Sequence, residues 1–137
     1  MENIDMELAC KLVALAAEKA KSDFKRPICI AVCDKSGFLV AYGRMEGAPL
    51  RSIEICQRKA YTAVRMGVNT DAFLERLRTD NVQIGYFGDD RFTALAGGNV
   101  LKDANGKMIG GIGVSGLLSS EDKVITDAMA AIVLGSK

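Results

Sequence analysis

The sequence contains no histidine among its 137 residues, and this absence excludes several kinds of site. A Ser–His or Cys–His nucleophile pair, a two-histidine zinc helix and a histidine-ligated haem cannot be built from this chain alone. Any catalysis would have to use carboxylates, lysine, tyrosine, cysteine or a bound cofactor. The absence of histidine therefore excludes much of known enzyme chemistry.

Long apolar runs and runs of like charge are also missing. The net charge is +1 and the sequence has no run of like charges, so we expect neither a nucleic-acid nor an anionic-membrane partner. The apolar runs are too short to span a bilayer, and Met1–Asp5 does not resemble a signal peptide. These features predict a cytoplasmic protein.

The four cysteines fit that location. Cys29 and Cys33 share one face of a predicted strand, where they lie too far apart for a disulfide. A C-x-x-x-C spacing without nearby partners is a poor zinc pattern, so we expect no metal site. Buried, reduced thiols are the prediction for all four.

Hydrophobic spacing and turn residues predict one domain over residues 1–137, with the element order α-β-β-α-α-β-β-β-α. The expected helices cover about residues 5–24, 50–66, 71–78 and 120–134, and the expected strands cover 27–33, 38–44, 93–96, 100–103 and 107–114. A turn at 34–37 and a type I′ turn at Asn105-Gly106 would make two hairpins. Residues 81–92 are expected to form a loop over a pocket. The result is an α+β fold with an antiparallel sheet of about five strands flanked by helices.

The glycine-rich stretch 110–116 is the most informative segment. On a strand, Gly111 and Gly113 point to one face and leave a strip of bare backbone, which a packed helix, a neighbouring subunit or a flat ligand could approach. Ser119 can then cap a helix with Asp122 three residues on, and the free N–H groups of that helix suit a carboxylate or phosphate. The G-x-G-x-x-G spacing is not a dinucleotide fingerprint, because no second parallel strand follows the helix.

Two charged residues remain open to more than one interpretation. Lys59 lies in mid-helix beside the apolar stripe, where it could reach an anionic ligand or belong to a solvated or salt-bridged face. Asp34 could bind a ligand, but its place in a turn favours turn chemistry alone.

Three motifs in order resemble the GlcG/HbpS family, which also supplies the C-terminal domain of PduO-type corrinoid adenosyltransferases. Residues 30–49 read I-A-V-x-D-x-x-G-x-L-V-A-x-x-R-M-x-G-A-P, residues 52–63 read S-I-x-I-x-x-x-K-A-x-T-A, and residues 110–122 read G-G-x-G-V-S-G-x-x-x-x-x-D. The resemblance implies a helix-flanked antiparallel sheet, homo-oligomeric assembly and, for some members, haem or corrinoid binding. It also implies a place beside pathways for small diols, glycerol or glycolate, whereas the adenosyltransferase activity belongs to a different domain.

The sequence departs from the family pattern at two points. Asn99-Val100 stands where many members carry a proline after the paired glycines. Haem-binding members can use histidine, so an iron ligand here would have to be a methionine, cysteine or tyrosine, with Met45, Tyr42 and Tyr61 as candidates, or the tetrapyrrole is held without a side-chain ligand. Haem and cobalamin both remain open as cofactors.

Three hypotheses for the function follow. In the first, the protein is a homo-oligomeric accessory protein of small-diol, glycerol or hydroxy-acid catabolism that binds a small molecule or tetrapyrrole over the glycine strip. In the second, it is an enzyme on a small hydroxy- or keto-acid or an aldehyde, using Asp122, Lys59 or Asp34. In the third, it is an oligomeric structural or assembly protein. The candidate ligand-binding residues are Arg44, Pro49, Lys59, Gly97, Gly98, Gly111, Gly113, Ser115, Gly116 and Asp122.

Overall fold

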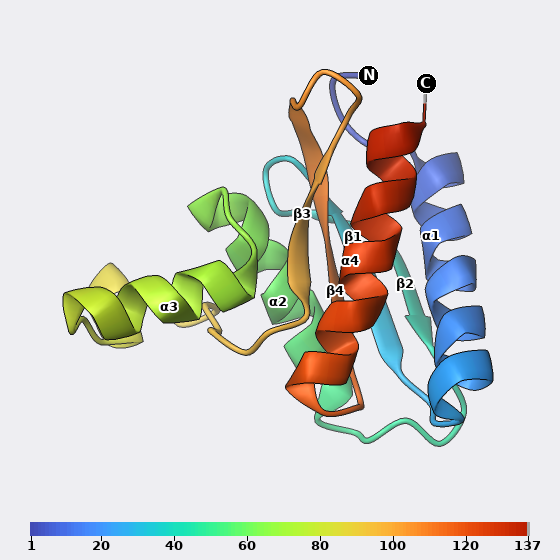
Figure 1. Ribbon diagram of the computed structural model, residues 1–137, viewed down its shortest axis with the longest axis horizontal. Helices are drawn as coiled ribbons and strands as arrows, with labels where there is room; N and C mark the ends of the chain where they lie inside the picture. The colour runs from blue at the N-terminus through green and yellow to red at the C-terminus, as the bar shows by residue number, and fades with distance from the viewer. Residues whose placement is uncertain (137) are drawn as a thin grey trace.

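The computed structural model describes residues 1–136 and shows an antiparallel sheet between two helical layers (Figure 1). The strands lie in the order β2-β1-β4-β3. Their bounds are β1 (Cys29–Asp34), β2 (Leu39–Arg44), β3 (Gly98–Lys102) and β4 (Met108–Ser115). The helical segments are α1 (Met6–Lys19), η1 (Ala20–Phe24), α2 (Ser52–Met66), α3 (Thr70–Asp80), η2 (Ile84–Phe87) and α4 (Ser119–Gly135). The α+β class and the helix-flanked antiparallel sheet are confirmed.

One face of the sheet carries the main hydrophobic core, beneath α1 and α4. Branched side chains alternate along β1 and β4 toward this face, because successive strand residues point to opposite sides. The buried members include Leu12, Ile28, Ile30, Val32, Ile112, Val114, Ile125, Met129 and Val133. Burial of a large aliphatic side chain contributes about 1.5–3 kcal/mol, so this layer supplies most of the favourable free energy of folding.

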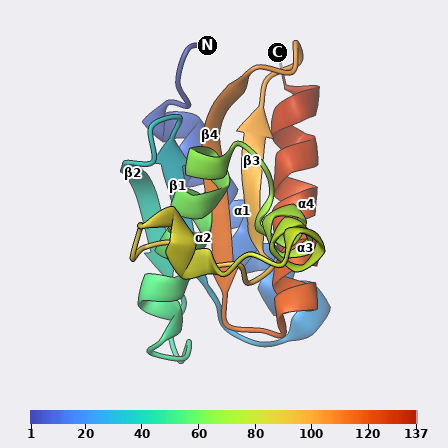
Figure 2. The same ribbon diagram turned by 90° about the vertical axis from the view of Figure 1, so that its left-hand side faces the viewer.

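The opposite face is covered mainly by α2, with the start of α3 against β3. In Figure 2, α2 lies in front of the sheet and α1 behind it. Small residues line this face, and Cys29, Ala31 and Cys33 of β1 are all buried. Both faces of β1 are therefore covered, as its continuous apolar sequence predicted. From this layer α3 projects sideways, away from the body of the protein (Figure 1).

The sheet has four strands and not about five, because residues 93–96 form no strand. The backbone N–H of Thr93 donates to Thr62 Oγ1 on α2, which removes it from any ladder. Gly98 was expected to break a strand, but it begins β3 and pairs with Gly113. The expected strand at 100–103 therefore begins two residues earlier.

The two hairpins form as expected, but one of their turns has a different geometry. Asp34 Oδ1 accepts from the N–H groups of Ser36 (2.9 Å) and Phe38 (3.0 Å), so turn chemistry is its observed role. In the second hairpin only Gly106 has positive φ, whereas a type I′ turn requires two such residues. Asp103 Oδ1 instead accepts from the N–H groups of Asn105 and Lys107, and the strand register shifts at Lys102.

Helix ends differ from the predictions where side chains have other partners. The first helix changes to the π-helical turn η1 after Lys19 and ends at Lys25, whose φ is 56°. The N-cap residue of α3 is Asn69. Thr70, although its side chain is also suited to capping, is the first residue of the helix, and its Oγ1 accepts from the buried N–H of Gly98 at 2.9 Å. Cys29, Cys33 and Cys56 are buried free thiols, but Cys10 is exposed.

Candidate functional site

The most deeply enclosed charges are Lys59 on α2 and Asp122 in the first turn of α4. Their exposed fractions are 1% and 2%. Lys59 Nζ donates to Asp122 Oδ2 at 3.0 Å and to the carbonyl oxygen of Val114 at 2.8 Å. Asp122 Oδ1 accepts from the N–H of Leu117 at 3.1 Å. The pair therefore ties α2, the end of β4 and α4 together.

Gly97 closes the remaining side of this pair. Its φ is +108°, and a Cβ added there would lie 2.7 Å from Asp122 Cβ and 3.0 Å from Lys59 Nζ. Burial lowers the pKa of Lys59 and raises the pKa of Asp122, while their mutual attraction opposes both shifts. Each group is the other's hydrogen-bond partner, and both are shut off from solvent. Through these contacts they hold α2, the end of β4 and α4 together.

The glycine strip of β4 is covered by α2. A Cβ on Gly113 would lie 1.9 Å from the carbonyl oxygen of Cys56, and one on Gly111 would lie 2.6 Å from Val64 Cγ2. Across the sheet, a Cβ on Gly98 would lie 2.5 Å from the carbonyl oxygen of Lys59. The idea that this strip stays open for a guest or a second subunit is wrong, because the backbone of the chain's own helix already occupies it.

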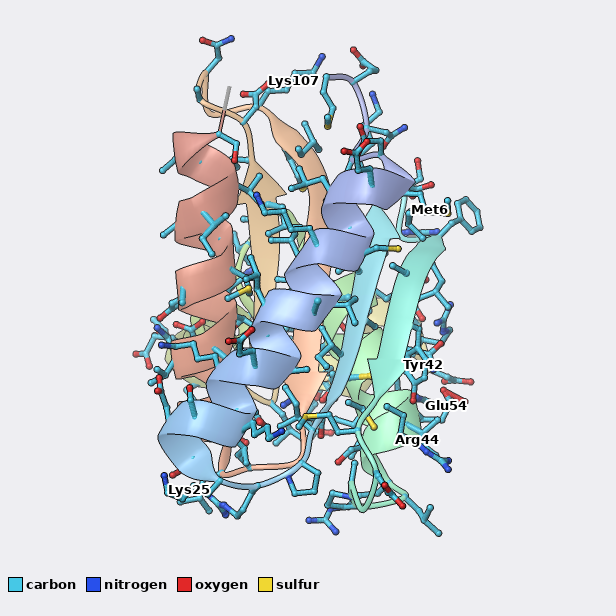
Figure 3. All side chains as sticks on the ribbon, turned by 90° about the vertical axis from the view of Figure 1, so that its right-hand side faces the viewer. Met6, Lys25, Tyr42, Arg44, Glu54 and Lys107 are labelled. Carbon is cyan, nitrogen blue, oxygen red and sulfur yellow. The ribbon has the colours of Figure 1, made fainter. Side chains whose placement is uncertain are left out.

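The other four candidates lie at the end of the sheet where β1 begins and β4 ends. Ser115 Oγ donates to Ser52 Oγ at 3.2 Å in a buried contact. Gly116 has φ +139° and packs on the backbone of Pro27 and Ile28. Arg44 ends β2 on the exposed surface beside Tyr42 (Figure 3), and Pro49 lies in the turn before α2, where its carbonyl oxygen accepts from the N–H of Ser52.

The ten candidates thus divide into three groups. The enclosed pair with its glycine contains Lys59, Gly97 and Asp122; the floor under α2 contains Gly98, Gly111 and Gly113; the sheet end contains Arg44, Pro49, Ser115 and Gly116. They do not converge on one cavity. Ser119 is not the helix cap either, since α4 is preceded by Leu118, whose N–H donates to Glu121 Oε1 at 3.1 Å.

An open groove lies instead beside η1, and Met45 is at its centre. Two adjoining hollows of about 480 and 620 Å³ share Lys21 and Met45 in their walls. The remaining lining residues are Ala17, Glu18, Ser22, Lys25, Arg26, Pro27 and Glu46. Met45 is fixed in place because its N–H donates to the carbonyl oxygen of Ile28 at 3.0 Å and its sulfur accepts from the Ile28 N–H at 3.4 Å. We call this surface the Met45 groove.

Positive charge surrounds the Met45 groove on the side of η1. Lys21 forms no salt bridge within residues 1–136, and Lys25 Nζ contacts only the carbonyl oxygen of Ser22 at 3.4 Å. Lys25 lies at the lower end of the molecule, below α1 (Figure 3). Arg26 is engaged with Glu121 at 2.5 Å. Lys21 in η1 and Lys25 at its C-cap could therefore pair with an anion. π-Helical turns frequently occur at functional sites.

Sequence reasoning did not single out Lys21 and Lys25, which line the Met45 groove. The first helix was expected to run regularly to residue 24, so the change to η1 and the left-handed conformation of Lys25 were not anticipated. A signal was present in the sequence, because Lys19, Lys21, Lys25 and Arg26 place four basic residues within eight positions. Met45 was considered only as an iron ligand.

Of the three possible iron ligands, Met45 is the one in such a groove. Tyr61 is 8% exposed, and its hydroxyl donates to Asp89 Oδ2 at 2.5 Å. Tyr42 lies on β2, and burial together with its hydrogen bond to Cys29 raises its pKa. Within residues 1–136, no cluster of three Cys, Asp or Glu side chains could hold a metal ion, and no helix is long and apolar enough to cross a bilayer.

Comparison with known proteins gives a consistent result. Residues 4–131 match the family described as "Haem degrading protein HbpS-like". A Citrobacter freundii protein, described as an uncharacterized 15.0 kDa protein in the dhaT-dhaS intergenic region, is 30% identical over 123 residues, which are 87% of this chain and 84% of that protein.

Two solved structures are similar along almost their whole length. A double mutant of HbpS from Streptomyces reticuli is 29% identical with a TM-score of 0.86, covering 97% of this chain and 88% of that chain. A complex of PduOC with haem is 25% identical with a TM-score of 0.84, covering 94% of both chains.

Proposed function

The chain belongs to the haem-degrading HbpS-like family, and from that premise we propose that it is an accessory protein that binds a tetrapyrrole in the Met45 groove. The observation that carries the proposal is a thioether in a groove that is also lined by two lysines, neither of which forms a salt bridge within residues 1–136. A relative of similar fold is known in complex with haem, which supports the choice of ligand class.

The residues of the groove fit a haem in two respects. Haem combines a flat apolar ring with two carboxylates, and the groove combines Ala17, Pro27 and Met45 with Lys21 and Lys25. Thioether sulfur is a known axial ligand of haem iron, and lysines pair with carboxylates as mobile point charges. Haem would supply a redox-active iron, while the chain's part is to hold the ring and neutralise its carboxylates.

Two features set the limits of this fit. Glu18 and Glu46 also line the groove, so the ligand's carboxylates must lie on the side of the two lysines. The hollows are open rather than enclosed, although their volumes fall in the range of about 300–1,000 Å³ that ligand pockets usually have. An open site of this kind favours reversible binding, as suits an accessory protein that passes its ligand on.

Titration of the purified protein with ferric haem and, in parallel, with cobalamin tests the proposal. We expect a saturable one-to-one change of the Soret band with haem. The variant Met45→Leu keeps the apolar volume but removes the sulfur, so the iron spectrum should change. Lys21→Gln with Lys25→Gln should weaken binding by about tenfold or more, from the loss of two charge-assisted contacts. Lys102→Gln, on β3, is the matched control.

The outcomes separate the ligand from the place where it binds. If neither tetrapyrrole gives a saturable change, the proposed function is wrong. If haem binds but Met45→Leu and the double variant of Lys21 and Lys25 both behave like the parent protein, the Met45 groove is not the site. A corrin shift without a Soret change would make the ligand a corrinoid.

Assembly, location and pathway extend the same proposal. A homo-oligomer is supported by α3, which projects from the body of the protein (Figures 1 and 2). Beside α3, an apolar trough is lined by Leu74, Leu77, Ile84, Phe92 and Leu95 among others. The cytoplasm and a role beside diol, glycerol or hydroxy-acid catabolism are in keeping with the resemblance and with the Citrobacter relative. Native mass spectrometry tests the assembly, and a single-chain mass would contradict it.

A further inference from the structure

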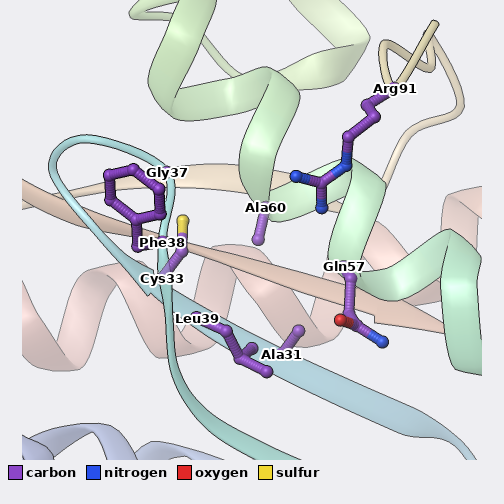
Figure 4. Close-up of a pocket in the computed structure, with 8 residues that line it drawn as sticks. All are labelled: Ala31, Cys33, Gly37, Phe38, Leu39, Gln57, Ala60 and Arg91. Atoms are coloured by element: carbon purple, nitrogen blue, oxygen red, sulfur yellow. The ribbon is translucent and has the colours of Figure 1, made fainter.

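A second hollow lies on the other side of the sheet, in the angle between α2 and the edge strand β2 (Figure 4). Its volume is about 150 Å³. The hollow exists because α2 packs over β1, β3 and β4, which leaves the α2-facing side of β2 uncovered. Its walls are Ala31, Cys33, Gly37, Phe38, Leu39, Gln57, Ala60 and Arg91. We call it the Arg91 pocket.

The floor and the rim of the Arg91 pocket differ in character. Ala31, Cys33 and Ala60 are buried and small, and they form an apolar floor. Burial raises the pKa of the Cys33 thiol to about 12, so the floor carries no thiolate at neutral pH. Phe38 and Leu39 are 67% and 53% exposed, and they form the rim. A ligand must therefore bring a short carbon skeleton to the floor.

Arg91 supplies a positive charge at the side of the pocket. Its guanidinium carbon lies 4.4 Å from the centre of the Tyr61 ring, and Arg65 lies 4.8 Å from the same ring. Arg91 forms no salt bridge with any side chain of residues 1–136. The neighbouring Asp89 accepts from the Tyr61 hydroxyl and from the Arg91 backbone N–H. The guanidinium points toward the pocket in Figure 4, where its free N–H donors match a carboxylate.

Gln57 adds a hydrogen-bond acceptor to the wall of the pocket. Its Nε2 donates to the carbonyl oxygen of Ile53 at 2.8 Å, and this fixes the orientation of the amide because a carbonyl can only accept. The other amide atom, Oε1, is therefore the acceptor left for a ligand. An acceptor at this point requires a hydroxyl or another donor on the ligand.

We propose that the Arg91 pocket binds a short carboxylic acid that also carries a hydroxyl group, with the carboxylate on Arg91, the hydroxyl on Gln57 and the carbon chain on the alanine floor. The size agrees, because a cavity of about 150 Å³ holds a molecule of about six heavy atoms, the size of benzene. This inference is independent of tetrapyrrole binding, which concerns the opposite side of the sheet.

A four-ligand comparison tests the class of ligand by following the backbone amide signals of the full-length protein in solution. Lactate is the probe, and each of the others lacks one feature: propionate lacks the hydroxyl, lactamide lacks the charge, and propane-1,2-diol lacks the carboxylate. We expect saturable shifts with lactate at Ala31, Cys33 and Ala60. Propionate should bind several-fold more weakly, and the two uncharged molecules should leave these signals unchanged.

Two variants test the residues. Arg91→Gln lies on an exposed loop and should abolish lactate binding, whereas Gln57→Leu should remove the preference for lactate over propionate. Arg76→Gln is the matched control, because Arg76 also stacks on an aromatic ring, 5.5 Å from the centre of Phe87, but lies outside the pocket. Haem titration of Arg91→Gln should match that of the parent protein.

Several results would overturn the inference. If lactate and lactamide shift the same signals equally, charge plays no part and the proposal fails. It also fails if the shifts fall at Lys21 and Lys25, or if Arg76→Gln weakens binding as much as Arg91→Gln. The proposal likewise fails if Arg91→Gln and Gln57→Leu both keep the full affinity for lactate.

Discussion

Replacement of Lys59 by methionine is the substitution that most directly tests how the enclosed pair works. Methionine keeps the apolar stem but removes the ammonium, so Asp122 keeps only the N–H of Leu117 and the carbonyl of Val114 loses its donor. Removing one partner of a buried ion pair typically costs about 3–5 kcal/mol, because the other charge is left unpaired. A domain of this size has about 5–15 kcal/mol in total, so Lys59→Met should lower the midpoint of thermal unfolding by about 10–20 °C.

Two further variants separate the buried charge from other effects. Lys123→Met is the matched control on the surface, where Lys123 pairs with Asp127 at 2.6 Å in solvent, and it should cost less than about 1 kcal/mol. Lys59→Met combined with Asp122→Asn removes both charges, so it should recover a large part of the loss. Chemical denaturation followed by circular dichroism gives all three free energies of unfolding.

The pH dependence of Lys59→Met has a definite sign. Burial already raises the pKa of Asp122, and removal of Lys59 takes away the influence that opposes this shift. A carboxyl with a higher pKa in the folded than in the unfolded chain binds its proton preferentially when folded. The stability deficit of the variant should therefore be largest at about pH 7.5 and shrink toward about pH 5, as Asp122 becomes neutral. If Lys59→Met costs no more than Lys123→Met, or if its deficit grows on acidification, the reasoning about the enclosed pair is refuted.

Three other predictions concern packing, thiol reactivity and a turn. Gly113→Ala should lower the free energy of unfolding, measured in denaturant, by about 3 kcal/mol or more, because its Cβ would meet the backbone of α2. Gly135→Ala, whose Cβ would have no atom within 4 Å, should have the same free energy of unfolding as the parent. A thiol reagent should modify Cys10 at once and Cys33 and Cys56 only on unfolding, because burial raises the pKa of both buried thiols to about 12; rapid loss of all four thiols would contradict this. Asp34→Ala should cost about 1 kcal/mol in calorimetry, from two turn N–H groups left without their acceptor, and an unchanged melting temperature would contradict that role.

Most of the fold could be predicted from local patterns in the sequence. The helical stripe ending at Gly67, the turn at Asp34 and the continuous apolar run of β1 each depend on neighbours within a few residues, and each appears as expected. The expected strand at 93–96 failed for a reason outside any local window. Thr93 gives its N–H to Thr62, more than thirty residues away, and no short pattern records that contact.

The candidate site was harder to predict than the fold. Gly111 and Gly113 were correctly identified as a bare strip, but the sequence cannot say which of a helix, a subunit or a ligand covers it. In the structure, α2 packs on the strip and covers it. The Met45 groove and the Arg91 pocket depend on η1 and on the offset of α2 from β2, which are features of tertiary packing.

Close packing and the buried charges depend on each other. Because glycines at 98, 111 and 113 carry no side chain, the backbone of α2 comes close enough to the sheet for Lys59 to reach Val114 and Asp122. A larger residue at any of these glycines would lift α2 and break both hydrogen bonds. The motifs that carry the family resemblance therefore describe how the helix docks on the sheet. Met45 and Gln57 lie within the motif ranges, but the charged residues proposed to meet ligands, Lys21, Lys25 and Arg91, lie outside them, so relatives that share the motifs can differ in what they bind.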